Sequence, residues 1–190
     1  AIICTGIGYY LDKNSTSTAV QESAAALQAE VEQTKKPENV MNMLGVDHME
    51  LEIGYALIPL VDSGQGGDFL DRIVLIRRQI AGELGFIVPV IRVRDNINLQ
   101  PNQYIIKIKG AEIASGELLA DHYLAISSGL DDDSLPGTPT KEPAFGLDAK
   151  WINAANREQA ELSGYTVVDA PTVLATHLTE IIKTYAYDLL

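Results

Sequence analysis

The sequence is short of cysteine, of basic residues and of long hydrophobic runs, and each shortage excludes a class of protein. Cys4 is the single cysteine among 190 residues, so the chain can form neither an intramolecular disulfide nor a multi-cysteine metal site. Lys and Arg number 14 against 26 Asp and Glu, and the net charge of −12 would repel nucleic acid, which is held mainly by Lys and Arg. A secreted disulfide scaffold and a nucleic-acid-binding role are therefore disfavoured.

The apolar N-terminal stretch, residues 1–11, is shorter than the roughly 20 residues that a membrane-spanning helix needs. It also lacks the basic start of a signal peptide. Its aromatic pair Tyr9-Tyr10, followed by Asp12, is typical of the point at which a spanning helix leaves the bilayer. We therefore expect residues 1–11 to be the end of a truncated membrane helix, with a frayed apolar terminus as the alternative.

Residues 12–47 are rich in Ser, Thr, Gln, Glu, Lys and Ala and hold few large apolar residues. Such a composition buries too little apolar surface to offset the entropy of ordering the chain, so it predicts a flexible linker. The globular part is predicted to begin near Met49, in a chain that is 46% hydrophobic with a mean hydropathy of +0.04.

From Met49 onward the residue periodicity predicts regular elements. Residues 51–61 alternate well enough for a strand, which the glycine-rich residues 63–68 end. Apolar residues recur at helical spacing from Phe69 until Gly85, a residue that suits a helix stop, and Asp68 is predicted to be the N-cap of that helix. Further strands are predicted over 87–93 and in a β-hairpin whose strands, 104–109 and 112–118, flank Gly110.

Residues 121–169 differ in charge from the rest of the chain. They hold nine acidic residues against three basic ones and so carry −6 of the net charge of −12, which indicates a small subdomain of their own. Within them, Asp148 is predicted to cap a helix that continues to Ser163, with Leu147 and Ile152 spaced as a hydrophobic staple around the cap.

The last predicted helix begins at Asp169 and continues to Leu189. One face of this helix carries an apolar stripe that includes Leu174. At about 100° per residue, Thr176 lies roughly 200° from Leu174 and hence on the face opposite the stripe. Thr176 is therefore predicted to point away from the core.

The sequence motifs that usually carry catalysis are missing. The glycine-rich residues 63–68 lie where a phosphate loop would but lack Gly-Lys-Ser/Thr, so they predict a plain turn. His48, His122 and His177 stand on different predicted elements without the His-Glu-x-x-His pattern, and we interpret them as packed or surface residues. The acidic run 131–133 lacks the spacing of a calcium loop. We expect no enzyme activity, no metal and no cofactor.

Phe145 is the residue that most suggests binding. It follows Glu142-Pro143-Ala144 and precedes Gly146, so a rigid turn presents an aromatic ring beside an acidic residue. An exposed aromatic on such a turn is a typical binding anchor. A ring that fills a small local core is an equally good interpretation.

Several groups of residues occur in an order that is more specific than any one of them: Leu51-Glu-Ile-Gly-Tyr-Ala-Leu-Ile-Pro59, Gly67-Asp-Phe-Leu-Asp-Arg72 with Ile76-Arg-Arg78, Arg92-Val-Arg-Asp-Asn96, Pro143-Ala-Phe-Gly-Leu-Asp148 with Trp151, and Thr166-Val-Val168 with Ala175-Thr-His-Leu178. Together they resemble the FHIPEP family, the membrane export-gate proteins of flagellar type III secretion and their injectisome relatives. The resemblance covers about residue 51 to the end of the chain and is closer to the flagellar branch.

The resemblance implies an α+β fold, in which a small mixed or antiparallel sheet with packed helices is interrupted by a small inserted α/β subdomain. The first cytoplasmic subdomain would comprise residues 48–120 and 170–190, and the second would comprise residues 121–169. Residues 1–11 would be the end of the last membrane helix and residues 12–47 the linker. The family's third and fourth subdomains have no counterpart in this sequence.

The resemblance also implies a site and partners. In the family, a hydrophobic groove between the first two subdomains receives flagellar export chaperones with their cargo, and its acidic, aromatic and threonine positions fall on Glu142, Phe145 and Thr176. The family commonly has Asp at the first position, so Glu142 keeps the charge and changes the reach. Other implied partners are further export-apparatus proteins and, for the full-length protein, a homo-oligomeric ring. The implied location is the bacterial inner membrane, with this part facing the cytoplasm.

The resulting hypothesis is a non-enzymatic docking platform of the flagellar type III protein export gate, with Phe145 as its apolar anchor and Glu142 and Thr176 as polar neighbours. The alternative is a mainly structural segment that links the membrane part to a ring, or an injectisome homologue. An enzymatic role, with the turn at residues 64–67 holding a phosphorylated ligand, has the least support.

Overall fold

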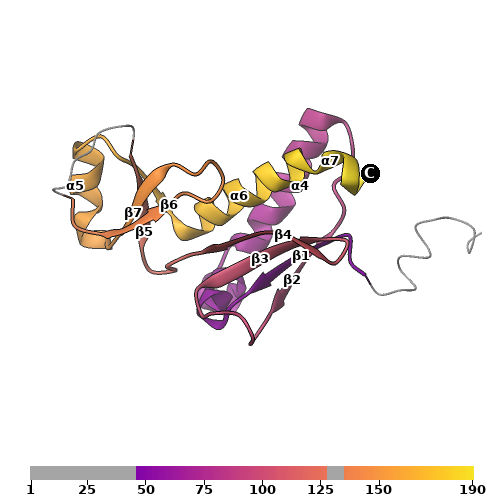
Figure 1. Cartoon of the computed structure of the whole chain (residues 1–190), viewed down its shortest axis with the longest axis horizontal. Coiled ribbons are helices and arrows are strands. Elements are labelled where there is room, and N and C mark those ends of the chain that lie inside the picture. The colour runs from indigo at the N-terminus through magenta and orange to yellow at the C-terminus, as the bar shows by residue number, and fades with distance from the viewer. Residues whose placement is uncertain (1–45, 128–134) are drawn as a thin grey trace, which may run out of the picture. The chain divides into compact units, whose positions relative to one another are not determined.

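The computed structural model describes residues 46–127 and 135–190 (Figure 1). The predicted membrane-helix remnant, residues 1–11, and all but the last two residues of the predicted linker lie outside the described residues, as does the acidic run 131–133. Within the described part of the chain, no helix is both long enough and apolar enough to span a bilayer.

The first sheet is mixed and has four strands in the order β2-β1-β3-β4. β1 pairs with β2 in parallel and with β3 antiparallel, and β3 and β4 form an antiparallel hairpin. A parallel pair requires a crossover, which the helical residues between β1 and β2 provide. The bounds of the strands are Met49–Ile53 for β1, Ile91–Asp95 for β2, Gln103–Ile108 for β3 and Ala111–Glu117 for β4.

The strand predicted over residues 51–61 ends at Ile53, so its second half was wrong. Gly54 packs so closely against the loop before β3 that an added Cβ would lie 2.1 Å from the Gln100 carbonyl oxygen. Pro59 has no N–H to give to a sheet but suits the first turn of a helix. The chain therefore turns helical, in η1 (Tyr55–Leu57), α3 (Ile58–Val61) and η2 (Ser63–Gln65).

Helix α4 (Phe69–Leu84) is confirmed, and Gly85 ends it in the left-handed conformation with φ 75°. Asp68 holds the predicted N-cap position, but its carboxylate makes no capping hydrogen bond and instead accepts a hydrogen bond from the Arg72 Nε at 2.9 Å. The strand predicted over residues 87–93 starts only at Ile91. Before it, the Val88 carbonyl oxygen accepts hydrogen bonds from the Arg77 guanidinium at 2.9 and 3.2 Å.

The hairpin around Gly110 is confirmed. Lys109 and Gly110 connect β3 to β4 with φ values of 49° and 81°, the left-handed pair that matches the twist of antiparallel strands. The register shifts between Ile106 and Lys107.

The second sheet is antiparallel and has four strands in the order β6-β7-β5-β8. The helix predicted from Asp148 to Ser163 is wrong in its first part, and with it the predicted staple of Leu147 and Ile152, because Asp148 begins strand β7. Asp148 and Lys150 face outward while Ala149 and Trp151 are buried, a two-residue alternation that suits a strand. The elements are β5 (Tyr123–Ile126), β6 (Thr138–Lys141), β7 (Asp148–Ile152), η3 (Ala154–Asn156), α5 (Arg157–Leu162) and β8 (Thr166–Asp169).

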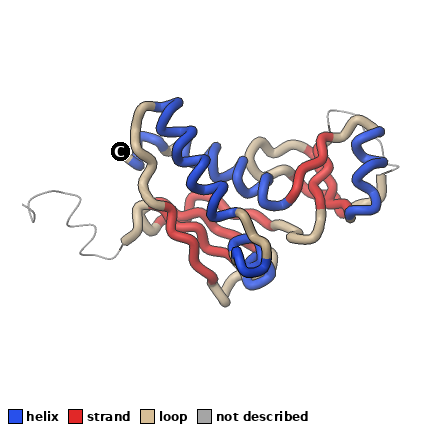
Figure 2. Tube along the Cα trace, turned by 180° about the vertical axis from the view of Figure 1, so that it is seen from behind, coloured by secondary structure: helices blue, strands red, loops and turns tan. Residues whose placement is uncertain are grey.

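Helix α6 (Ala170–Thr184) follows directly on β8 and lies beside α4 over the first sheet (Figures 1 and 2). The helix predicted to continue to Leu189 is interrupted at Tyr185, after which α7 (Ala186–Leu189) follows. The main core lies between these helices and the first sheet and takes in Leu124 and Trp151 from the second. The α+β class and the mixed sheet are confirmed; that residues 121–169 form a folding unit of their own stays a prediction.

Asp169 starts α6 as predicted. Its Oδ1 accepts a hydrogen bond from the Thr172 N–H at 3.2 Å, and its Oδ2 lies 3.5 Å from the Arg72 guanidinium. We expect Asp169→Ala to lower the free energy of unfolding by about 1 kcal/mol, the usual cost of losing an N-cap, when measured by urea denaturation. Asp169→Asn keeps the cap and should lose much less. Equal losses in both variants would show that the Arg72 ion pair, and not the cap, stabilises this helix start.

Candidate functional site

The turn between β6 and β7, residues 142–147, is closed by hydrogen bonds from both ends of Glu142. Its N–H donates to the Leu147 carbonyl oxygen at 2.8 Å, and its own carbonyl oxygen accepts from the Gly146 N–H at 2.8 Å. Gly146 has φ 70°, a conformation that glycine adopts without strain. The rigid turn predicted from the sequence is therefore present, and we call residues 142–147 the Phe145 turn.

The Phe145 turn exposes the Phe145 ring to solvent. The ring is 60% exposed, and Leu147 on the same turn is also exposed. Of the two interpretations of Phe145, the structure excludes a ring buried in a local core. A large exposed aromatic on a braced turn has little conformational freedom left to lose on binding, which favours its use as an anchor.

Glu142 does not lie at the surface beside Phe145, where the sequence analysis placed it. Its side chain is only 3% exposed and lies under the turn, where Oε1 accepts the Ala144 N–H at 2.9 Å and Oε2 accepts the Phe145 N–H at 2.7 Å. A carboxylate that accepts two backbone N–H groups is strongly held. Glu142 therefore positions Phe145 from beneath and does not reach the surface beside it.

Tyr104 and His177 form a buried polar pair that sequence reasoning did not assign to the site. The Tyr104 hydroxyl and the His177 Nδ1 are 2.7 Å apart and hydrogen-bonded, with the rings edge to face at 5.8 Å between centroids. Tyr104 comes from β3 and His177 from α6. Gly116, opposite Tyr104 on β4, leaves room for the hydroxyl, because an added Cβ would lie 2.6 Å from that oxygen. A polar histidine inside an apolar helix stripe was the available signal.

The pKa values of both buried residues depend on burial and on the Glu142 carboxylate of the Phe145 turn. Burial raises the pKa of the Tyr104 phenol well above its usual range, and the nearby Glu142 carboxylate adds to this. Burial lowers the pKa of the His177 imidazole, while the Glu142 carboxylate acts in the opposite direction. The charge of Glu142 on the Phe145 turn therefore acts on Tyr104 of the first sheet and on His177 of α6. Both views show the turn beside α6 (Figures 1 and 2).

Thr176 lies on α6, one residue before His177, and is half-buried. Its Oγ1 donates to the Thr172 carbonyl oxygen at 2.9 Å, one turn back in the same helix. The hydroxyl is thus hydrogen-bonded within the helix, so the methyl group is the part of the side chain left to contact another residue. Thr176 is less exposed than its predicted place opposite the core stripe suggests.

The pKa of His177 predicts how stability depends on pH. The unfolded imidazole takes up a proton near its ordinary pKa of 6.5, whereas the folded one, whose pKa is lowered by burial, does so only at lower pH. The stability that neutral His177 contributes is therefore complete above about pH 6.5 and is lost as the pH falls through the folded pKa. We expect the difference in free energy of unfolding between wild type and His177→Gln to shrink between about pH 7.5 and pH 5. Parallel curves for the two proteins would contradict this.

The other chemical candidates do not form sites. Within the glycine-rich residues 63–68 only Ser63–Gln65 form a 3₁₀ turn, and its N-cap Asp62 accepts the Gly64 N–H on Oδ1 at 2.9 Å, so an acidic group already occupies the start of the loop. His48 and His122 are half-buried and lie apart from His177 along the chain. Across residues 46–127 and 135–190, no group of three His, Cys, Asp or Glu side chains is arranged to hold a metal ion.

Comparison with known proteins gives consistent matches. The FHIPEP family matches residues 1–190. The flagellar biosynthesis protein FlhA of Bacillus subtilis (strain 168) is 53% identical over 182 residues, which are 96% of this chain and 27% of that protein. This chain thus spans about a quarter of the length of that relative.

Solved structures share the fold. The Chlamydia pneumoniae CdsV protein matches with a TM-score of 0.64 and 24% identity, over 76% of this chain and 47% of that one. The Chlamydia pneumoniae CdsV and CdsO complex matches with a TM-score of 0.61 and 22% identity, over 75% of this chain and 45% of that one. Nonameric EPEC SctV-C matches with a TM-score of 0.50 and 17% identity, over 76% of this chain and 41% of that one. At these identities the likeness concerns the fold. The family match over the whole sequence and the 53% identity show that this chain belongs to the FHIPEP family, which includes the flagellar biosynthesis protein FlhA.

Proposed function

We propose that this chain is a non-enzymatic docking platform of the flagellar type III protein export gate, which binds export chaperones that carry cargo. The observation that carries the proposal is the 60% exposed ring of Phe145 on a turn held by the buried Glu142 carboxylate. An exposed aromatic anchor in a preformed position binds a partner without first being ordered. We propose that Thr176 on α6 supplies a further contact with the partner.

The proposed partners follow from the family. Besides chaperones with cargo, we propose that the full-length protein binds other export-apparatus proteins and assembles into a homo-oligomeric ring. In support, a solved relative of the same fold is a complex of CdsV with CdsO, and another is nonameric. The proposed location is the inner membrane, with the described residues on the cytoplasmic side. We propose no nucleic-acid partner.

The proposed interaction is of modest affinity and reversible. A single buried aromatic side chain contributes about 1 to 3 kcal/mol, which suits a station that must pass its cargo on. The charge of −12 further favours partners whose contacting surface is neutral or basic.

Substituting Phe145 tests the proposal directly. We expect Phe145→Ala to weaken capture of a purified export chaperone–cargo complex by about tenfold or more, measured by calorimetry or biolayer interferometry. Thermal unfolding should stay near wild type because the ring is exposed. The matched control is Leu162→Ala, which removes a strongly exposed apolar side chain from α5 and should not change binding. Equal affinities for wild type and Phe145→Ala would refute the assignment.

A further inference from the structure

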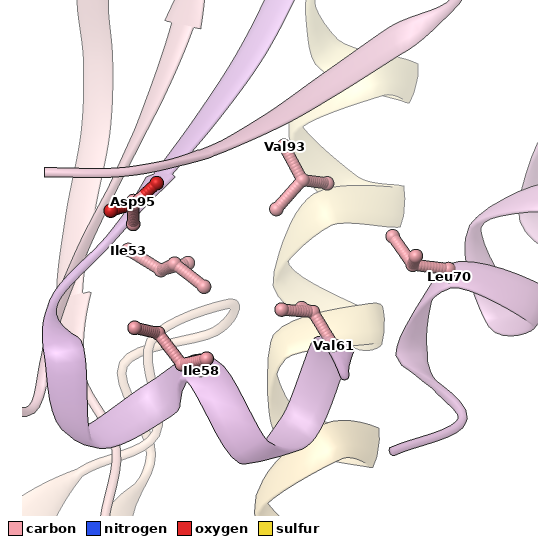
Figure 3. Close-up of a pocket in the computed structure, with 6 residues that line it drawn as sticks. All are labelled: Ile53, Ile58, Val61, Leu70, Val93 and Asp95. Carbon is pink, nitrogen blue, oxygen red and sulfur yellow. The ribbon is translucent and has the colours of Figure 1, made fainter. Parts of the chain in front are cut away.

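An apolar pocket lies between the first sheet and the helices that follow β1 (Figure 3). Its volume is about 220 Å³, which suits one large side chain better than a drug-sized ligand. Ile53 and Asp95 are the last residues of the parallel strands β1 and β2, so the pocket opens at the carboxyl ends of a parallel pair, the usual place for ligands in α/β arrangements. The lining residues are Ile53, Ile58, Val61, Leu70, Val93 and Asp95.

The apolar surface continues outside the pocket. Leu70 and Val74 are one turn apart on α4 and both are exposed, Leu70 at the pocket itself. Pairs of large exposed apolar side chains beside a pocket are typical of protein contact surfaces.

The pocket lies next to an open sheet edge. β2 is the outermost strand, and no other described strand pairs with its far side. The Asn96 N–H donates to the Ile53 carbonyl oxygen of β1. Because main-chain groups alternate in direction along a parallel ladder, those of Val93 and Asp95 point away from β1. An extended peptide can pair with them, as in recognition by strand addition.

Asp95 carries the one charge in the pocket lining, and among the described residues its carboxylate has no ion-pair partner. The acids on the opposite face of these strands are all paired. Asp47 bonds to Arg92 and Arg94 at 3.2 and 2.8 Å, Glu50 bonds to Arg94 at 3.2 Å, and Glu52 bonds to Lys107. The free carboxylate is therefore available to a basic group of a partner.

We propose that this edge binds an extended segment of a partner protein, which adds a strand to β2, inserts an aliphatic side chain into the pocket and places a Lys or Arg against Asp95. Val93 and Asp95 face the pocket side two residues apart, so a segment that runs parallel to β2 is recognised by the pattern apolar-x-basic, with one residue between. A second copy of this chain fits less well, because antiparallel pairing of two β2 strands would place Arg92 opposite Arg94. The surface shares no residue with the Phe145 turn and is independent of the proposed function.

A peptide titration of the full 190-residue chain, isotope-labelled for NMR, tests the proposal. The probe is acetyl-Ser-Thr-Leu-Thr-Lys-Thr-Ser-amide. We expect saturable shifts of the Val93 and Asp95 amides and of the Leu70 and Val61 methyl groups, with a Kd of about 1 mM or tighter. Replacing the peptide's Leu by Ala, placing Leu and Lys next to each other, or methylating the backbone nitrogens of the peptide should each weaken binding about tenfold or more.

A charge exchange tests the role of Asp95. Asp95→Lys is an exposed change at a strand end and should bind a peptide with Glu in place of Lys better than the original, while wild type shows the reverse preference. Several results would overturn the proposal: no saturation, shifts confined to residues 142–147, equal affinity for the Lys and Glu peptides, or the same shifts on concentrating the chain without peptide, which would identify a second copy as the occupant.

Discussion

Gly54→Ala is expected to lower the free energy of unfolding by about 3 kcal/mol, because one methyl group would enter space already filled by main-chain atoms. The added Cβ would lie 2.1 Å from the Gln100 carbonyl oxygen and 2.5 Å from that of Pro101. The Ala56 N–H also donates to the Pro101 carbonyl oxygen at 3.0 Å, so this loop cannot retreat without breaking a hydrogen bond. Chemical denaturation measures the effect.

The backbone dihedrals show that the cost is one of contact and not of conformation. Gly54 has φ −72° and ψ 161°, values open to alanine. The matched control is Gly82→Ala inside α4, where an added Cβ meets nothing within 4 Å. There the substitution should raise stability by about 0.5 to 1 kcal/mol through helix propensity. A Gly54→Ala protein as stable as wild type would show that the contact with the Gln100 loop is loose.

Glu142→Ala is expected to lower the free energy of unfolding by about 2 to 4 kcal/mol and to weaken partner capture as Phe145→Ala does. Its carboxylate oxygens accept the Ala144 and Phe145 N–H groups, which would lose their acceptors, and the space filled by this 3% exposed side chain would be left empty. Glu142→Gln keeps the size but has a single oxygen, so its NH₂ group would face one backbone N–H. We expect the free energy of unfolding of Glu142→Gln to lie between those of wild type and Glu142→Ala.

Two measurements separate positioning by Glu142 from direct contact with a partner. The pKa of His177, followed by NMR of its imidazole, should fall further in Glu142→Gln because the carboxylate raises it in wild type. Lys141→Ala, an exposed change next in the chain, should alter stability by less than about 0.5 kcal/mol. A Glu142→Ala protein with wild-type stability and lost binding would mean that Glu142 touches the partner.

The candidate site was predictable only in part. The motif around residues 143–148 placed an aromatic on a turn beside an acid, and the structure has that turn with Phe145 exposed. The burial of Glu142 was not predictable, because an acid beside a turn is usually solvated. The pairing of Tyr104 with His177 was not predictable either, since their 2.7 Å contact joins residues 73 positions apart.

The sequence by itself determined the elements whose hydrogen bonds close within a few residues. These are α4 with its Gly85 stop, the hairpin at Lys109 and Gly110, and the start of α6 at Asp169. Short-range caps and left-handed turn residues act on their neighbours, so their effect can be read locally.

Only the tertiary structure decided where distant segments override local preference. β1 ends at Ile53 because Gly54 meets the Gln100 loop, and Asp148 begins a strand because β7 lies between β6 and β5, where its backbone groups find partners. Each outcome depends on contacts with residues far away in the chain, and the energy of those contacts exceeds the small differences in intrinsic propensity that a sequence pattern expresses.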